Sequence, residues 1–258
     1  MTRAVPPGDQ PAPAEGSICL SEDDLLSLDE AVSRDPAYNE RRLVLRRKLA
    51  GLGKNFCALR RKPKLGLDSR TSLHNPHAFN GQRVRRIWAY CIRSKAEKGR
   101  LRKVVGADLA RDLDAAFRNA YFCLAVEAEA VEVAIRIHSD AWFDGANLAR
   151  RVKADGPEPL TAILNDLDGF QLSLADWKGE WRCGDLGPSR IEEFFGYFEP
   201  GTHSLALARR WPAPRSQSAV RAALCQPEAM AQLGEEMERL VPFYRYAAWS
   251  KESDFLFG

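Results

Sequence analysis

The stretch "AYFCLAVEAEAVEVAIRIH" (residues 120–138) decides the fold of this chain. It contains two apolar segments that meet around Glu129, and this arrangement predicts the two strands of an antiparallel hairpin. In the second segment valine and isoleucine occupy one face, while the polar side chains Glu132, Arg136 and His138 occupy the other. The first segment is apolar on both faces, as is typical of a central strand. We therefore expect a sheet that is built outward from this hairpin.

Further strands and helices flank the hairpin. Apolar or alternating runs predict strands at "VRRIWAYCIR" (84–93), "FQLSLADW" (170–177) and "THSLALARRW" (202–211). Helical patterns lie before, between and after these strands. This order predicts an α+β fold with a mixed or mainly antiparallel sheet, flanking helices, and helical N- and C-terminal segments.

The chain is expected to divide into a leader and one domain. Residues 1–20 contain four prolines among their first 13 positions and no apolar run, so we expect a disordered leader rather than a signal peptide. Residues 21–258 are expected to form a single α+β domain. Its predicted parts are N-terminal helices (21–53), a basic loop and sheet region (54–211) and C-terminal helices (212–258).

Local signals predict where several elements begin and end. The helix that precedes the sheet is expected to end at Gly53. Turn-forming residues over 60–82 predict a long loop. A second helical segment is expected over 95–117, with a break at Gly106, and Ser139 is expected to cap the helix that follows the hairpin.

The composition is that of a globular protein, and it excludes several function classes. Hydrophobic residues make up 45% of the chain and charged residues 28%. No run approaches the roughly 18 apolar residues of a membrane-spanning helix, so no membrane partner is expected. The six cysteines are scattered without a CxxC pair, which argues against structural zinc and favours reduced thiols in the cytoplasm. The motifs of nucleotide-binding loops, hydrolase elbows and zinc proteases are missing, so neither a cofactor nor a metal is predicted.

Charge is distributed unevenly along the chain. Residues 41–103, here called the basic block, hold 20 Lys or Arg against only Asp68 and Glu97, a local net charge of +18. The remainder carries 18 basic and 33 acidic residues, a net charge of −15. Such separation favours a surface that binds a polyanion. The alternative is that the block neutralises itself against the acidic remainder of the same chain.

The basic block predicts a nucleic-acid-binding surface around "SLHNPHAFNGQRVRRIWAYCIR" (72–93). Its cations would contact phosphates, and its asparagines would shape the loop. Strand alternation puts Arg86, Trp88 and Tyr90 on one face, a combination that can stack single-stranded bases. The simpler interpretation, which we favour for the aromatics, is that they pack beneath a helix. The predicted contact residues are Lys62, Lys64, Asn75, Asn80, Arg83, Arg85, Arg86, Arg100 and Arg102.

A second candidate site lies at the end of the hairpin. His138 and Asp140 would form a general base and its orienting carboxylate, with Glu132 and Asp144 nearby. Such a group would fit a hydrolase or a nuclease. Helix capping and surface exposure explain the same side chains without any chemistry.

Three functions are therefore open at this stage. The leading hypothesis is a cytoplasmic protein that binds nucleic acid, either DNA or RNA, or another polyanion. Most of its contacts would be to the backbone of the nucleic acid rather than to the bases. The first alternative is a hydrolase or nuclease at His138. The second is a structural or scaffold protein whose basic block binds an acidic protein partner.

Overall fold

The computed structural model describes residues 19–59, 65–78, 82–108, 110–111 and 113–257. These residues form a seven-stranded sheet in the order β1-β2-β3-β4-β7-β5-β6, and each pairing between neighbouring strands is antiparallel. The predicted α+β class, with its mainly antiparallel sheet and flanking helices, is confirmed. The strands are β1 (Leu67–Thr71), β2 (Arg86–Arg93), β3 (Tyr121–Glu127), β4 (Ala130–Ile137), β5 (Gln171–Leu174), β6 (Trp181–Arg182) and β7 (Leu205–Pro212).

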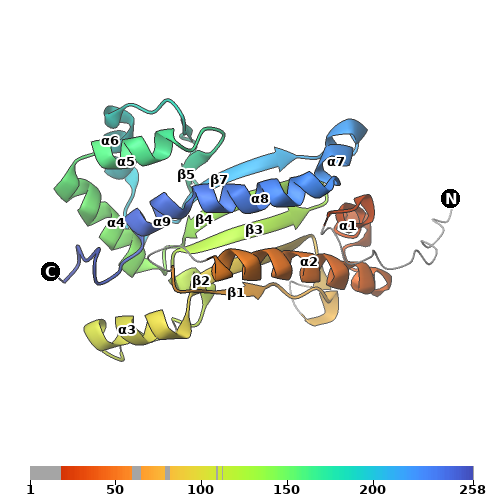
Figure 1. The fold of residues 1–258 in the computed structure, drawn as a ribbon, viewed down its shortest axis with the longest axis horizontal. Helices are drawn as coiled ribbons and strands as arrows, with labels where there is room; N and C mark the ends of the chain where they lie inside the picture. Colours follow the sequence, from red (N-terminus) through yellow and green to blue (C-terminus); the bar gives the residue numbers. More distant parts are fainter. Residues whose placement is uncertain (1–18, 60–64, 79–81, 109, 112, 258) are drawn as a thin grey trace.

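Helices cover one face of the sheet, here called the covered face. Figure 1 shows α2, α8 and α9 in front of the strands, while α3 projects beyond the edge formed by β1 and β2. None of the described helices is both long and apolar enough to cross a membrane. The α-helices in the described residues are α1 (Glu22–Leu26), α2 (Asn39–Ala58), α3 (Lys95–Val105), α4 (Trp142–Asp155), α5 (Glu158–Asn165), α6 (Pro188–Tyr197), α7 (Ser218–Leu224), α8 (Pro227–Arg239) and α9 (Val241–Ala247).

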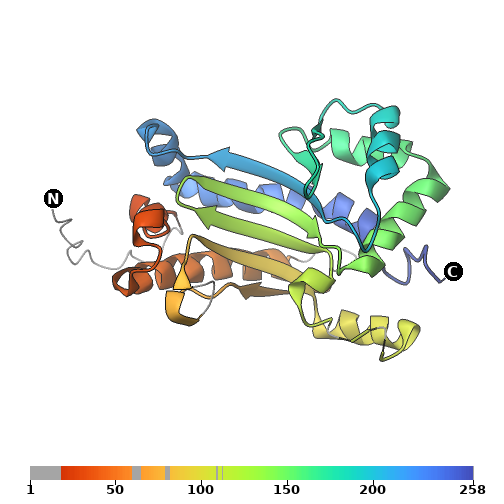
Figure 2. The same ribbon diagram turned by 180° about the vertical axis from the view of Figure 1, so that it is seen from behind.

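The opposite face of the sheet, here called the open face, carries no such layer. Figure 2 shows strands β1 to β4 and β7 from behind, and none of the described helices crosses them on this side. The two faces of each strand therefore meet different surroundings, one apolar and closed, the other in contact with solvent.

The main core lies between the covered face and its helices. The Phe122 ring of β3 lies 4.8 Å from the Phe56 ring of α2 and 5.0 Å from the Tyr244 ring of α9, measured between ring centroids. One row of paired side chains crosses four strands on this face, and each member is at most 1% exposed. The members of the row are Phe122, Ile135, Leu207 and Leu172.

Helix α2 continues through Gly53, where the sequence predicted its end. Gly53 packs so close to β1 that a Cβ atom there would lie 2.3 Å from Ser69 Oγ. The glycine therefore allows the helix and the strand to approach each other, and it does not stop the helix. The helix ends five residues later, at Ala58.

Three other predictions about elements are wrong. The loop predicted over 60–82 contains β1, a polar edge strand that depends on backbone pairing with β2 rather than on apolar side chains. Where it is described, the segment after Gly106 forms turns and a 3-10 turn at Ala116–Arg118 instead of a helix. Ser139 does not cap α4, because the cap position is Ala141, two residues later, and no side chain caps this helix.

The expected leader falls almost entirely outside the described residues, which begin at position 19. Leu20, the last residue of that predicted leader, is described and is buried at 1% exposure. It belongs to the main hydrophobic core together with Leu25 and Leu28. The packed part of the chain therefore begins before position 21.

A buried ion pair joins the sheet to helix α4 and to the C-terminal segment. Arg93, at the end of β2, donates two hydrogen bonds to Asp144 of α4, from Nη1 to Oδ2 (2.7 Å) and from Nη2 to Oδ1 (2.5 Å). The same carboxylate accepts the backbone N–H groups of Ala120 (2.6 Å) and Trp249 (2.8 Å). Burial by itself lowers the pKa of Arg93, but Asp144 outweighs it and holds that pKa above its ordinary value.

Replacing Asp144 by asparagine (Asp144→Asn) should destabilise the fold by about 3–5 kcal/mol, because Arg93 would remain buried without its counterion. Urea denaturation followed by circular dichroism measures this change. The matched control is Asp140→Asn, whose carboxylate is 50% exposed and should matter by less than about 0.5 kcal/mol. Equal unfolding free energies for Asp144→Asn and the wild type would refute the structural role of the pair.

Candidate nucleic-acid interface

Aromatic side chains lie on the open face of the sheet. In β2 the residues that point to the covered face, such as Ile87 and Cys91, are fully buried, whereas Trp88 and Tyr90 are partly exposed. The favoured sequence interpretation, in which Trp88 and Tyr90 pack beneath a helix, is therefore wrong. Alternation separates the two faces of a strand, but it does not say which of them the helices will cover.

Small residues beneath these aromatics form a second, thin apolar layer. Cys123, Ala125 and Ala134 point to the open face and are at most 3% exposed, because Trp88 and Tyr121 pack against them. The Tyr90 and Tyr121 rings meet edge to face, with centroids 6.4 Å apart. The aromatic side chains are thus held against the sheet while part of their surface stays in contact with solvent.

Three arginines and two glutamates form a network beside the aromatics. Glu132 Oε1 accepts hydrogen bonds from Arg136 Nη2 (2.6 Å) and Arg86 Nη2 (2.9 Å). Glu127 Oε2 accepts from Arg210 Nη2 (2.5 Å), and its Oε1 lies 3.5 Å from Arg86 Nη1. Three positive charges against two negative ones give the network a surplus of one positive charge.

Neighbouring charges and burial set the protonation states of Glu132 and Tyr121 on the open face. Burial raises the pKa of Glu132, but Arg136 and Arg86 outweigh that effect and hold the pKa below its ordinary value of 4.5. Burial raises the pKa of Tyr121 to about 12, so its hydroxyl keeps its proton at neutral pH. The face therefore presents charged guanidinium groups and a neutral phenol.

Part of the basic block is neutralised within the chain. Several of its cations form ion pairs with carboxylates from outside the block, which is the alternative left open by the charge pattern. These pairs are Arg41–Asp23, Lys48–Asp24, Arg83–Glu30, Arg85–Glu30, Arg86–Glu127, Arg86–Glu132, Arg93–Asp144 and Lys98–Asp114.

The predicted contact residues do not gather into one patch. Arg86 lies on the open face, whereas Arg83 and Arg85 turn toward Glu30 in the segment before α2. Arg100 and Arg102 lie on α3, where Arg100 pairs with Glu97. Asn75 Oδ1 accepts the backbone N–H of His77 (2.9 Å) within its own loop. Lys62, Lys64 and Asn80 lie outside the described residues.

The candidate hydrolase group is only partly assembled. Asp140 donates its backbone N–H to His138 Nδ1 (3.2 Å), so that nitrogen is an acceptor and the ring proton sits on Nε2. The carboxylate, 3.5 Å from Nδ1, therefore has no N–H to receive from it. Glu132 lies six residues away along β4, about 20 Å at a rise of about 3.3 Å per residue. Asp144 is sequestered by Arg93.

No group of three or more His, Cys, Asp or Glu side chains within the described ranges is arranged to hold a metal ion. Asn147, three residues after Asp144 on α4, accepts the backbone N–H of Phe255 (2.9 Å) and donates to Ala247 O (3.3 Å). Both side chains serve the packing of the C-terminal segment.

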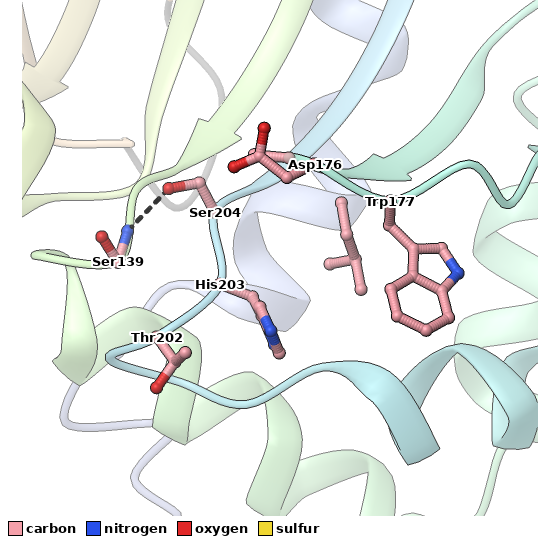
Figure 3. A pocket seen from close by; sticks show the side chains of 8 residues that line it. Ser139, Asp176, Trp177, Thr202, His203 and Ser204 are labelled. Atoms are coloured by element: carbon pink, nitrogen blue, oxygen red, sulfur yellow. Dashed lines mark hydrogen bonds between the residues drawn. The ribbon is translucent and has the colours of Figure 1, made fainter.

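Two adjoining hollows lie at the end of the sheet where β4 finishes and β7 begins. The large hollow, of about 440 Å³, is shown in Figure 3 and is lined by Ser139, Asp176, Trp177, Thr202, His203 and Ser204. The small hollow, of about 180 Å³, is lined by Tyr121, Arg136, His138, Ser173, Ser204 and Ala206. Leu174, Ala175 and Ser204 border both, so the hollows are neighbours.

Sequence reasoning missed several residues of this interface. Arg136 was assigned to the polar face of its strand but to no site, and Tyr121, Arg210 and Trp177 were not singled out. The signal for Tyr121 and Arg136 was available, because both follow the period-two alternation of the hairpin. Arg210 enters through the pairing of β7 with β4, in which it lies opposite Glu132.

Comparison with known proteins adds no relative. No protein family model matches the chain, and no curated protein is significantly similar to it. The site is therefore defined by its own residues alone.

The arginine network should make stability depend on pH. Because the pKa of Glu132 is lower in the folded state than its ordinary 4.5, its stabilising contribution is complete above that value and is lost as the pH falls through and below it. Glu132→Gln should cost about 1.5–3 kcal/mol at neutral pH and should flatten the loss of stability on acidification. Urea denaturation at a series of pH values measures both effects.

The matched control for that change is Glu129→Gln in the same hairpin, because the Glu129 side chain is exposed. It should leave both the stability and its pH profile as in the wild type. If Glu132→Gln and Glu129→Gln gave the same profile, the network would contribute nothing through Glu132.

Proposed function

We propose that this protein binds single-stranded nucleic acid in the cytoplasm, on the open face of its sheet. The observation that carries the proposal is the partly exposed row of Trp88, Tyr90 and Tyr121 beside charged arginines, on a face that none of the described helices crosses. Antiparallel sheets with aromatic side chains on one free face stack unpaired bases, which offer a flat π surface in every sequence.

The charges of the open face support a polyanionic ligand. The arginine network has a surplus of one positive charge. Arg70 of β1 is exposed and lies opposite Tyr90 in the sheet register. Guanidinium groups that flank stacked bases are suited to the phosphates between them.

The proposed contacts are mainly to bases through stacking and to phosphates through charge, so we expect little preference for base sequence. The basic block contributes through Arg70, and through Arg86 as part of the arginine network, rather than as a whole, because these two cations lie on the open face. Recovery of the chain with an acidic protein in a salt-sensitive complex, without nucleic acid, would favour the scaffold hypothesis instead.

Trp88→Ala should weaken binding of labelled single-stranded DNA and RNA by about five- to 150-fold, since stacking contributes about 1–3 kcal/mol per base. Fluorescence anisotropy at low salt measures the dissociation constants. Phe257→Ala is the matched control, because Phe257 is an exposed aromatic (46%) at the C-terminus, where its ring meets Trp249. Equal affinity of Trp88→Ala and the wild type would exclude the open face as the binding surface.

Arg70→Gln should lower the slope of log Kd against log salt by about 0.7, the amount expected for one lost phosphate contact to a single strand. Arg47→Gln removes an exposed cation of the same basic block from helix α2, which packs on the covered face, and should leave the slope unchanged. Anisotropy titrations across a salt series provide the slopes. Equal changes for the two variants would assign the effect to overall charge.

A further inference from the structure

The small hollow has the chemistry of an anion site. None of its described lining residues is acidic, and it is lined by Arg136, His138, Tyr121 and Ser173. Arg136 bonds Glu132 through Nη2, and a guanidinium has further N–H donors for a ligand. His138 accepts at Nδ1, so its Nε2–H is a donor, and the Tyr121 hydroxyl is protonated. Convergent donors of this kind suit a phosphate group.

The large hollow has the chemistry of a site for a planar ring. Trp177 is 46% exposed and its ring packs at a tilt against Tyr197, with ring centroids 4.4 Å apart and planes at 33°, so its orientation is held from one side. His203 Nδ1 accepts the backbone N–H of Glu199 (3.1 Å), which leaves Nε2–H as a donor. Figure 3 shows Trp177 and His203 on the lining of this hollow, together with Asp176 as an acceptor.

Ser204 lies where the small hollow and the large hollow meet. Its Oγ accepts the Ser139 N–H (3.0 Å), the bond drawn in Figure 3, and Ser204 borders both hollows. The hydroxyl hydrogen remains available to a ligand that spans the two hollows. The volume of about 440 Å³ lies within the usual range for small-molecule sites.

We propose that the two hollows together bind a nucleoside monophosphate, with the phosphate against Arg136 and His138 and the base against Trp177. The ligand is either a free nucleotide or the phosphorylated end of a strand that lies on the open face. Tyr121 and Arg136 belong to both the open face and the small hollow, so a strand could pass from one to the other. Only the strand-end source rests on the proposed function.

Isothermal titration calorimetry with AMP, UMP, adenosine and inorganic phosphate tests the site directly. Both nucleotides should bind, and adenosine and phosphate should each bind at least about tenfold more weakly because each fills one hollow only. Trp177→Ala and His138→Ala should each weaken AMP binding by about tenfold or more. Phe257→Ala, at an exposed ring outside the hollows, should leave it unchanged. No binding of AMP or UMP, or equal affinities for all variants, would overturn the free-nucleotide source.

Oligonucleotides distinguish the second source and separate this inference from the proposed function. A strand with a terminal phosphate, tested at the 5′ and at the 3′ end, should bind more tightly than its hydroxyl-ended counterpart, and Trp177→Ala should abolish the difference. One outcome is that strand binding depends on Trp88 but neither on the terminal phosphate nor on Trp177, and that no nucleotide binds. This outcome would refute nucleotide binding in the hollows and retain strand binding on the open face. Nucleotide binding without strand binding would retain the nucleotide site in the hollows and refute the proposed strand-binding site on the open face.

Discussion

One buried carboxylate, Asp144, fixes the end of the sheet at which the candidate sites lie. It accepts two hydrogen bonds from Arg93 of β2, one from the backbone just before β3, and one from Trp249 in the C-terminal segment. Four parts of the chain that are far apart in sequence therefore meet at one group. Because an unpaired buried charge is so unfavourable, the four parts are held in one arrangement. That arrangement sets Tyr121 at the start of β3 and directs the chain past His138 into α4.

The second constraint is that helices cover only one face of a wide antiparallel sheet. On the covered face, Phe122 and its neighbours pack into the main core. On the open face, small residues are paired with large ones, so that Trp88 and Tyr121 shield Ala125 and Ala134 without a helix above them. The large side chains thereby do two things. They cover the small residues of the central strands, and in the proposed function they offer aromatic surface to a ligand.

The net charge of the basic block suggests one large binding surface, but the ion pairs in the fold neutralise part of it. A net of +18 over 63 residues is a property of the sequence, but an ion pair depends on which carboxylate lies within about 4 Å in the fold. Ion pairs form between Arg85 and Glu30, between Lys48 and Asp24, and between Arg93 and Asp144. The cations proposed to meet a polyanion are those on the open face, where Arg70 is exposed and the arginine network has a surplus of one positive charge. The proposed binding surface is therefore the open face of the sheet and not the basic block as a whole.

The sequence by itself determined the hairpin, the α+β class and the two faces of each strand, because these depend on periodicity between near neighbours. It also marked Glu132, Arg136 and His138 as one polar face. It could not determine that β1 would form at a polar edge, which depends on pairing with β2, or that Gly53 would lie inside a helix, which depends on the close packing of α2 against β1. Only the tertiary structure decided which face the helices cover, which cations find a carboxylate, and which loops meet to form the hollows. Those outcomes depend on contacts between residues far apart in the chain, and no local pattern records them.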